Sequence, residues 1–276
     1  MSKTYIDKYY TKRIDAIKYI SIVDKMYNLL EYDYIIEPSA GAGAFSDNLP
    51  KNTIALDLIP EKDSIIKMDF FDFNFPKGKI IAIGNPPYGR RADLAKKFFN
   101  KCALYCDVIA FVLPRSMVRP SMHSNIDTRF HLKYEENLDY FELPDGNNFY
   151  RKSVFQIWEK DDFKIREKYK PIKKHKDFNL HHVIYAWDSK DKINNLKNIC
   201  EIGIGQNSMN IDSFKNFSKG SVWGVEPLQD NVVEIFKEMD FSWVEEEASC
   251  APSISKPNII ETYKKAKIKW ENNHMK

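Results

Sequence analysis

A chain of 276 residues has room for one large domain, or for a catalytic domain with a smaller appendage. With 43% hydrophobic residues it can bury a real core, and its 29% charged residues, of both signs and interspersed, are typical of a folded rather than a disordered chain. The net charge of +3 is compatible with a polyanionic partner but does not require one. No apolar run approaches the roughly 20 residues of a membrane span, and residues 1–10 lack a signal-peptide core. We therefore expect no membrane association and a cytoplasmic location, or a nuclear one in a eukaryotic host.

The first part of the chain has the rhythm of an α/β domain. Residues 12–31 carry apolar side chains at helical spacing and predict a helix that covers one face of a sheet. From residue 34 to residue 158, short apolar runs alternate with longer amphipathic stretches, which predicts strand, helix, strand units and a largely parallel sheet with helices on both faces. The expected strands are residues 33–36, 53–56, 64–68, 80–84, 108–113, 137–142 and 153–158.

The character of the chain changes after Trp158. Residues 159–176 are densely charged and rich in lysine, so we place a domain boundary near residue 160 and expect a catalytic domain at 1–160 and a second module at 161–276. The expected elements of that module are strands at 183–187, 198–204 and 221–225 and helices near 231–239 and 257–270. They favour a smaller α+β module.

The cysteines are scattered along the chain. Cys102 and Cys106 have the spacing of two small residues on one helix face, while Cys200 and Cys250 stand alone. No second pair and no nearby histidine completes a ligand set, so we expect no metal site.

The first candidate binding motif follows the strand expected at residues 33–36. There Glu37 and Pro38 lead into a run of tiny residues that ends at Phe45, and the run contains Ser39, Ala40, Gly41, Ala42, Gly43 and Ala44. Gly41 and Gly43 let a ligand approach the backbone closely, and the amide groups of a following helix would face that ligand. A small molecule bound over this turn is one interpretation, and a tight turn without a ligand explains the glycines equally well.

Two further acidic residues stand where later strands end. Asp57 follows residues 53–56, at a distance from the glycines where a carboxylate can accept hydrogen bonds from ribose hydroxyls. Asp69 precedes Phe70 one strand later, a pair suited to accept from an adenine amino group and to pack on its ring. Each could simply cap a turn, but their succession along neighbouring strand ends favours a nucleotide-like ligand.

The most specific motif follows the strand at residues 80–84 and reads Asn85, Pro86, Pro87, Tyr88. Two consecutive prolines fix the backbone, so that a carbonyl and the Asn85 side chain can point rigidly into a site. Tyr88 offers a flat face for a base. The motif indicates a loop that holds a planar amino group, and the alternative is a rigid loop without chemistry.

Together these motifs resemble the gamma group of adenine-N6 DNA methyltransferases, which have a Rossmann-like class I methyltransferase sheet. The resemblance covers about residues 9–158 and implies S-adenosyl-L-methionine as the cofactor. The cofactor contacts that it implies are Thr11, Glu37, Ser39, Ala40, Gly41, Gly43, Phe45, Asp57, Leu58, Asp69, Phe70 and Asn85. The catalytic residues that it implies are Asn85, Pro86, Pro87, Tyr88 and Phe149, the last as a second aromatic on the base. A core aromatic of a hairpin is the alternative for Phe149.

The resemblance implies direct methyl transfer to N6 of adenine in DNA, with duplex DNA as the partner and the base flipped out of the helix. Sequence recognition would then fall to residues 161–276. Phosphate contacts are expected from Lys164, Lys168, Lys170, Lys173, Lys174 and Lys176, unless these form a solvated linker. Base contacts are expected from residues 205–208 or 253–256, unless these are ordinary polar turns.

Other functions share the Asn-Pro-Pro-Tyr loop. Enzymes that methylate adenine in RNA, N4 of cytosine in DNA or a glutamine side chain of a release factor all present a planar nitrogen to such a loop. A recognition region that follows the catalytic half fits the DNA enzymes better than the glutamine enzymes, whose extra domain precedes it. From a different class, a catalytically silent subunit that binds nucleic acid would retain the fold, although the intact loop argues against it.

Overall fold

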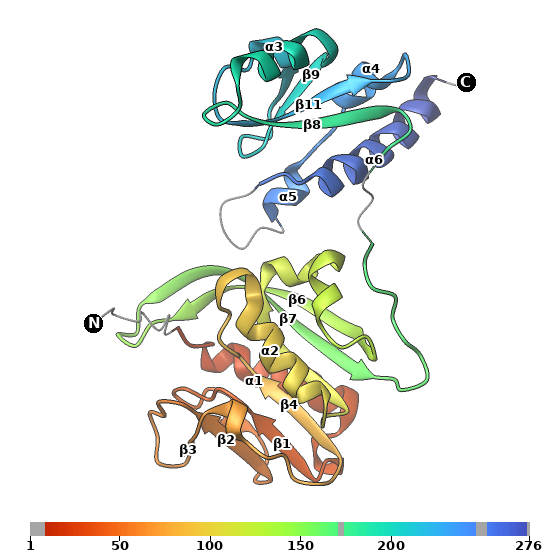
Figure 1. The fold of residues 1–276 in the computed structure, drawn as a ribbon. Helices are drawn as coiled ribbons and strands as arrows, with labels where there is room; N and C mark the ends of the chain where they lie inside the picture. Colours follow the sequence, from red (N-terminus) through yellow and green to blue (C-terminus); the bar gives the residue numbers. More distant parts are fainter. Residues whose placement is uncertain (1–8, 171–173, 247–252, 275–276) are drawn as a thin grey trace. The chain divides into compact units, whose positions relative to one another are not determined.

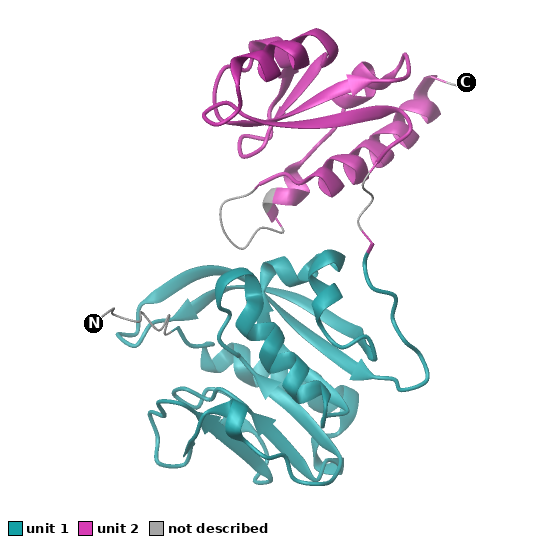
Figure 2. Cartoon of the chain, viewed as in Figure 1, with its two compact units in different colours: residues 1–169 teal, residues 170–276 magenta. Residues whose placement is uncertain are grey.

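The computed structural model describes residues 9–170, 174–246 and 253–274. The chain divides into two compact units, residues 1–169 and residues 170–276 (Figure 2). The first unit therefore extends past the boundary expected near residue 160. Arg166 accounts for the difference, because its Nε donates to the Phe130 carbonyl at 3.0 Å and its backbone N–H to the Thr128 carbonyl at 2.8 Å. These bonds hold the charged segment after residue 160 on the first unit.

A seven-stranded sheet with the order β3-β2-β1-β4-β5-β7-β6 forms the centre of the first unit (Figure 1). Its strands are β1 (Tyr34–Glu37), β2 (Thr53–Asp57), β3 (Ile66–Lys67), β4 (Ile80–Gly84), β5 (Val108–Pro114), β6 (Phe130–Glu142) and β7 (Asn148–Lys160). Strands β1 to β5 are mutually parallel, whereas β7 runs antiparallel to both β5 and β6. The strand order reverses between β1 and β4, and ligands of open α/β sheets bind at such a switch point, beyond the carboxyl ends of the strands.

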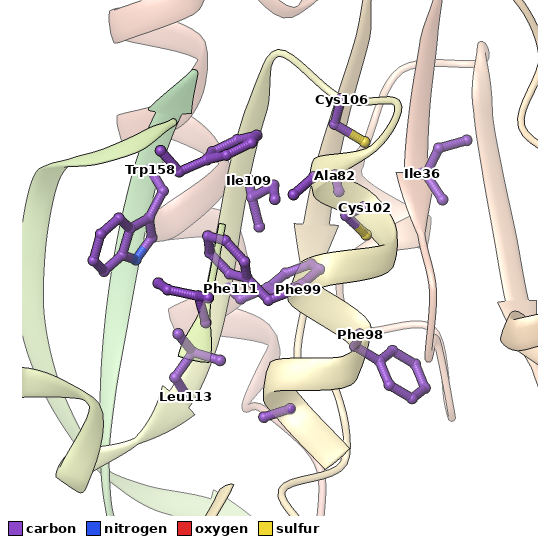
Figure 3. Packing of buried hydrophobic residues seen from close by; sticks show 14 of the residues in the cluster. Ile36, Ala82, Phe98, Phe99, Cys102, Cys106, Ile109, Phe111, Leu113 and Trp158 are labelled. Carbon is purple, nitrogen blue, oxygen red and sulfur yellow. The ribbon is translucent and has the colours of Figure 1, made fainter. Parts of the chain in front are cut away.

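Helices cover both faces of this sheet. Helix α1 (Arg13–Tyr27) buries residues such as Tyr19 and Val23 in a core shared with Ile35 and Ile81 of the strands. Alternate strand residues point to the opposite face and pack against α2 (Asp93–Ala103). In Figure 3, Phe98, Phe99 and Cys102 of α2 share that second core with Ile36, Ala82, Ile109 and Trp158. The Rossmann-like fold class predicted from the sequence is confirmed.

The expected alternation of strands with helices is wrong for the connections around β1, β2 and β3. Within residues 9–169, α2 is the one α-helix that connects two parallel strands, and β1 leads into turns and a short 3-10 helix, Ser46–Asn48. Gly41 and Gly43 have φ values of +52° and +84°, outside the right-handed helical region. No α-helix lies between β1 and β2, so the expectation that the amides of an α-helix start face a ligand there is also wrong.

The second unit is the smaller α+β module that the sequence predicts. Its antiparallel sheet has the order β10-β9-β11-β8. The strands are β8 (Phe178–Ile184), β9 (Ile202–Gly205), β10 (Ile211–Ser213) and β11 (Ser221–Pro227), and the helices are α3 (Lys190–Ile199), α4 (Val232–Lys237), α5 (Ser242–Glu246) and α6 (Lys256–His274). Helix α6 contributes Ile259, Ile260 and Tyr263 to the main core of this unit.

Two strands expected in this module are misplaced. Strand β8 begins at Phe178 and ends at Ile184, so most of the strand expected at 183–187 is a turn. The strand expected at 198–204 starts within α3, a helix that the sequence reading missed. Helix α3 buries only Ile193 and Leu196, and so sparse an apolar stripe leaves a weak helical signal. No helix among the described residues is long and apolar enough to cross a membrane.

Candidate functional site

A cavity of about 480 Å³ lies at the switch point of the first unit, beyond the carboxyl ends of β1, β2 and β4. Glu37 and Asp57 end β1 and β2, and Asn85 follows β4 directly. Of the residues predicted from the sequence, the cavity is lined by Thr11, Glu37, Ser39, Ala40, Gly41, Phe45, Asp57, Leu58, Asp69, Phe70, Asn85, Pro86, Pro87 and Tyr88. The volume is within the range of about 300–1,000 Å³ that small-molecule sites occupy.

The two glycines of the turn have different structural reasons. Gly41 lines the cavity, and a Cβ built on it would lie 3.0 Å from Cε1 of Tyr10, so the ring of Tyr10 packs where a side chain would stand. Gly43 does not line the cavity, and a Cβ there would lie 2.9 Å from Asp47 Oδ1, next to the Asp47–Lys62 ion pair. The sequence predicts that a ligand approaches Gly43 closely, but the structure places Gly43 outside the cavity lining.

The two acidic strand-end residues also shape the backbone. Asp57 accepts two backbone N–H groups at 2.8 Å each, from Gly41 on Oδ2 and from Ile59 on Oδ1, and so joins the end of β2 to the glycine turn. Asp69 Oδ1 accepts the N–H of Phe71 at 2.8 Å and caps a 3-10 helix. A carboxylate offers about four acceptor sites, so both residues retain capacity for a ligand.

Three polar atoms around the cavity are buried without a hydrogen-bond partner in the described structure: Thr11 Oγ1, Glu37 Oε2 and Asn85 Oδ1. Buried polar atoms are nearly always paired, because an unpaired one costs about 1–3 kcal/mol. These three come from separate parts of the chain and line the same cavity. Their convergence favours a bound ligand that supplies donors to each.

Glu37 has the most perturbed environment of the three. Its side chain is 1% exposed, and burial raises the pKa of the Glu37 carboxyl to about 8, against the opposing effect of hydrogen bonding from Ser46. Without a ligand, the carboxyl is therefore largely neutral at pH 7. A cationic ligand group would favour its ionised form, so Glu37 fits the positively charged end of a bound molecule.

The side-chain hydroxyl and the backbone carbonyl of Tyr88 both hold the Asn-Pro-Pro-Tyr loop in place. The Tyr88 hydroxyl donates to Ser153 Oγ at 2.9 Å, and its carbonyl accepts the N–H groups of Leu94 and Ala95 in the first turn of α2. The ring is 3% exposed, with the Arg151 guanidinium carbon 5.2 Å from its centroid. Burial also raises the pKa of Tyr88 above its usual range, so the phenol stays protonated. In this state the face of Tyr88 predicted to receive a base is already covered.

Phe149, the second predicted base-stacking residue, does not line the cavity. It lies on β7 opposite Phe141 of β6 and is half-buried. Its ring contacts Tyr9 with centroids 5.6 Å apart, and Tyr9 does line the cavity. The ring of Tyr9 thus lies between Phe149 and the cavity.

Tyr9 and Tyr10 are residues of the site that the sequence reading did not select. Tyr10 forms an antiparallel bridge with Glu142 through backbone bonds of 2.7 and 2.8 Å, and its hydroxyl donates to the Glu61 carboxylate. The bridge brings both tyrosines to the cavity from the chain's N-terminal segment. Two adjacent aromatic residues before a helix were the only sign of this role in the sequence. It is the pairing of Tyr10 with Glu142 of β6 that places both residues at the cavity.

The predicted recognition residues of the second part have mixed placements. The described lysines of that set, Lys164, Lys168, Lys170, Lys174 and Lys176, are all exposed, and Lys173 lies outside the described residues. Gln206 accepts the Ser221 hydroxyl at 2.5 Å and also contacts His182 at 3.2 Å. Ile254 is fully buried, and Ser255 bonds Asn258 at the start of α6. Residues 205–208 and 253–256 thus serve turns and a helix start within the unit.

The cysteines are structural where they are described. Cys102 and Cys106 are buried in the core around α2, and Cys200 is buried in the second unit. Cys250 lies outside the described residues. Among the side chains described, no group of three His, Cys, Asp or Glu residues could hold a metal ion.

No family model matches the sequence, and no curated protein matches it significantly. Among solved structures, the chain is similar to a protein from Pyrococcus horikoshii provisionally described as an RNA methyltransferase, with 17% identity over 58% of this chain and 90% of that one and a TM-score of 0.46. It is also similar to a Thermoplasma acidophilum protein, with 18% identity over 54% and 90% of the two chains and a TM-score of 0.39. A third similar structure is the 23S rRNA methyltransferase ErmE, with 9% identity over 94% and 100% and a TM-score of 0.41. These likenesses are loose and carry no conclusion about the activity of this chain.

Proposed function

We propose that this chain is an S-adenosyl-L-methionine-dependent methyltransferase that transfers a methyl group to an exocyclic amino group, with N6 of adenine in DNA as the preferred target. One observation carries the proposal: Asn85 Oδ1 is a buried acceptor with no partner among the described residues, beside two prolines in a cavity at the switch point of the sheet. An acceptor held in this way is ready for an amino hydrogen of a substrate.

The residues around the other part of the cavity fit the cofactor. Asp57 and Asp69, at the ends of neighbouring strands, offer carboxylate acceptors for ribose hydroxyls and an adenine amino group. The unpartnered Oε2 of Glu37 and Oγ1 of Thr11 fit the polar, cationic methionine end. When bound, the cofactor supplies a methyl group activated by a positively charged sulfur.

The chain's own contribution to the chemistry is to position and polarise the amino group. The lone pair of an exocyclic amine is delocalised into the ring, so the amine is a poor nucleophile. Asn85 Oδ1 and the Pro86 carbonyl would accept its two hydrogens and favour a pyramidal nitrogen, which is electrostatic and positional catalysis. Pro86 and Pro87 hold these acceptors rigidly. No residue is required as a covalent nucleophile.

The choice of polymer rests on the resemblance of residues 37–41 to DNA enzymes and on the position of the second unit after the catalytic one. The second unit would supply target recognition, with the exposed lysines of residues 164–176 contacting phosphates. A duplex base must leave the helix to reach Asn85, at a cost of a few kcal/mol that aromatic stacking partly offsets.

The decisive experiment is expression of the chain in cells that lack DNA methylation, followed by single-molecule sequencing of their DNA and analysis of modified nucleosides in their RNA. We expect N6-methyladenine in DNA at a defined sequence, absent with Asn85→Ala. Detection of N4-methylcytosine in DNA, or of N6-methyladenine in RNA alone, would show that the target is not N6 of adenine in DNA. Calorimetry with S-adenosyl-L-methionine on the purified protein covers the remaining case, because a silent subunit would bind no cofactor.

A further inference from the structure

The ring of Tyr9 is enclosed by four planar groups. Its centroid lies 5.0 Å from Phe141 and 5.6 Å from Tyr88, with interplanar angles of 74° and 71°, so both neighbours meet it in edge-type contacts. Phe149 lies 5.6 Å away with a tilt of 35°, and the guanidinium carbon of Arg151 lies 5.2 Å from the same centroid. We call these four residues the aromatic box.

The walls of the aromatic box are rigidly held. Phe149, Arg151 and Ser153 all lie on β7, which has a β-bulge between Tyr150 and Ser153. Ser153 in turn accepts the Tyr88 hydroxyl at 2.9 Å. The fourth wall, Phe141, is fully buried on the neighbouring strand β6. Three of the walls thus depend on β7, and the fourth lies on the strand paired with it.

The occupant of the box is held differently from its walls. Tyr9 comes from a segment outside the named strands and helices, which is joined to β6 by the single bridge between Tyr10 and Glu142. Helix α1 begins only at Arg13. Withdrawal of Tyr9 would break its hydrogen bond with Tyr88 and disturb the anchors of Tyr10 on Glu142 and Glu61, but it would leave the pairing of the seven strands intact.

The box also opens toward the reactive position. Tyr9 and Tyr88 line the same cavity as Asn85, whose Oδ1 is buried without a partner in the described structure. A flat ring with polar edges, surrounded by aromatic edges and one guanidinium, is favoured in such an enclosure. A nucleobase is planar and aromatic like the phenol ring, although a purine is larger, and its amino group supplies hydrogens for the Asn85 acceptor.

The resemblance implies that the target base stacks on Tyr88 and Phe149, and we infer that Tyr9 occupies the place of that base in the ligand-free protein. This inference rests on the proposed function. Entry of the base requires Tyr9 to withdraw, after which Tyr88, Phe149 and Arg151 contact the base. It explains why Tyr88 is covered and why Phe149, although predicted to stack on the base, is separated from the cavity by one ring.

The test measures binding of the fluorescent base 2-aminopurine to the full chain, with saturating S-adenosyl-L-homocysteine present to fill the cofactor part of the cavity. Tyr9→Ala empties the box and should bind the probe at least tenfold more tightly than the wild type, with quenching of its fluorescence by stacking. Tyr9→Phe keeps the ring and should behave like the wild type. Tyr105→Ala is the matched control, because Tyr105 is an exposed tyrosine that stacks on Phe75 away from the cavity.

Two further variants protect the conclusion. Tyr9→Leu keeps apolar volume without a planar ring and replaces Tyr9→Ala if that variant does not fold. Phe149→Ala, added to the Tyr9 variant, should remove the gain in affinity, which locates the probe in the box. Equal or weaker binding by folded Tyr9→Ala or, in its place, folded Tyr9→Leu overturns the inference and makes Tyr9 a wall of the site. Since the probe needs no methyl transfer, this result is independent of whether the proposed reaction occurs.

Discussion

One buried carboxyl in each unit shows the contrast between a polar group with strong partners and one without them. In the second unit, Asp177 is 2% exposed, and its Oδ2 accepts from Lys267 Nζ at 2.8 Å and from the Tyr263 hydroxyl at 3.1 Å. In the first unit, Glu37 and Asn85 are also turned inward, yet each has an oxygen without a partner in the described structure. The difference separates a group that stabilises the fold from groups prepared for a ligand.

The same contrast appears in the direction of the pKa shifts. Burial alone would raise the pKa of both carboxyls, and it does so for Glu37, to about 8. Burial also opposes ionisation of Asp177, but hydrogen bonds from Lys267 and Tyr263 outweigh it and lower the Asp177 pKa. A buried carboxyl whose hydrogen bonds outweigh the effect of burial remains charged and stabilises its unit, whereas one whose hydrogen bonds are too weak, such as Glu37, remains largely protonated until a ligand arrives.

The largest effect should come from removing the satisfied group. Asp177→Ala leaves Lys267 without its buried partner and should lower the free energy of unfolding of the second unit by about 3–5 kcal/mol. Chemical denaturation, followed by hydrogen exchange to locate the loss, measures it. Lys269→Ala, at an exposed position of α6, is the control and should cost less than about 0.5 kcal/mol. A small loss for Asp177→Ala would show that the pair only offsets its own desolvation.

Asn85→Ala should have the next largest effect, on rate instead of stability. Loss of one preorganised acceptor should lower single-turnover methylation by about 10²–10³, or about 2.7–4 kcal/mol, while cofactor affinity barely changes. Asn137→Ala, at an exposed position of β6, is the matched control. Near-normal turnover by the Asn85 variant would remove Asn85 from the mechanism. If the wild type preferred a duplex without adenine, the target would be cytosine.

Glu37 should make stability depend on pH. Its folded pKa of about 8 lies above the ordinary value of 4.5, so the folded state binds the proton more tightly. Its contribution is fully present below about pH 4.5 and is lost as the pH rises through about 8. Glu37→Gln should abolish this decline in thermal melts between pH 5 and 9 and weaken cofactor binding at pH 8. An unchanged decline in the variant would assign it to another group.

Asp57→Ala should have the smallest effect, divided between ligand and fold. Loss of charge-assisted bonds to ribose should weaken cofactor binding by about 1.5–3 kcal/mol. The sequence alone predicts little effect on folding, but Asp57 also accepts the N–H groups of Gly41 and Ile59. A loss of about 1 kcal/mol in stability should therefore accompany the loss in affinity, measured by denaturation and calorimetry. Unchanged affinity would contradict the ribose assignment.

The amino-acid sequence by itself determined the strands of the catalytic sheet and the polar residues at their ends. Strands such as β4 and β5 are buried on both faces and read as continuous apolar runs, so a polar residue that ends such a run stands out. For this reason Asp57 and Asn85 were predicted, and both line the cavity. The change in composition after Trp158 predicted a second unit, and the mixture of expected strands and helices predicted its α+β nature.

The tertiary structure alone decided the contacts between distant segments. The apolar stripe of α3 is too narrow to predict a helix from the sequence. The Asp177–Lys267 ion pair joins the residue before β8 to a residue of α6 that is 90 residues later in the chain. Tyr9 acquires its role only because its segment pairs with β6 and lies against β7. No local periodicity encodes such a contact, since its energy comes from packing between elements that are remote in the chain. The sequence thus specified which groups end each strand, and packing specified what covers them.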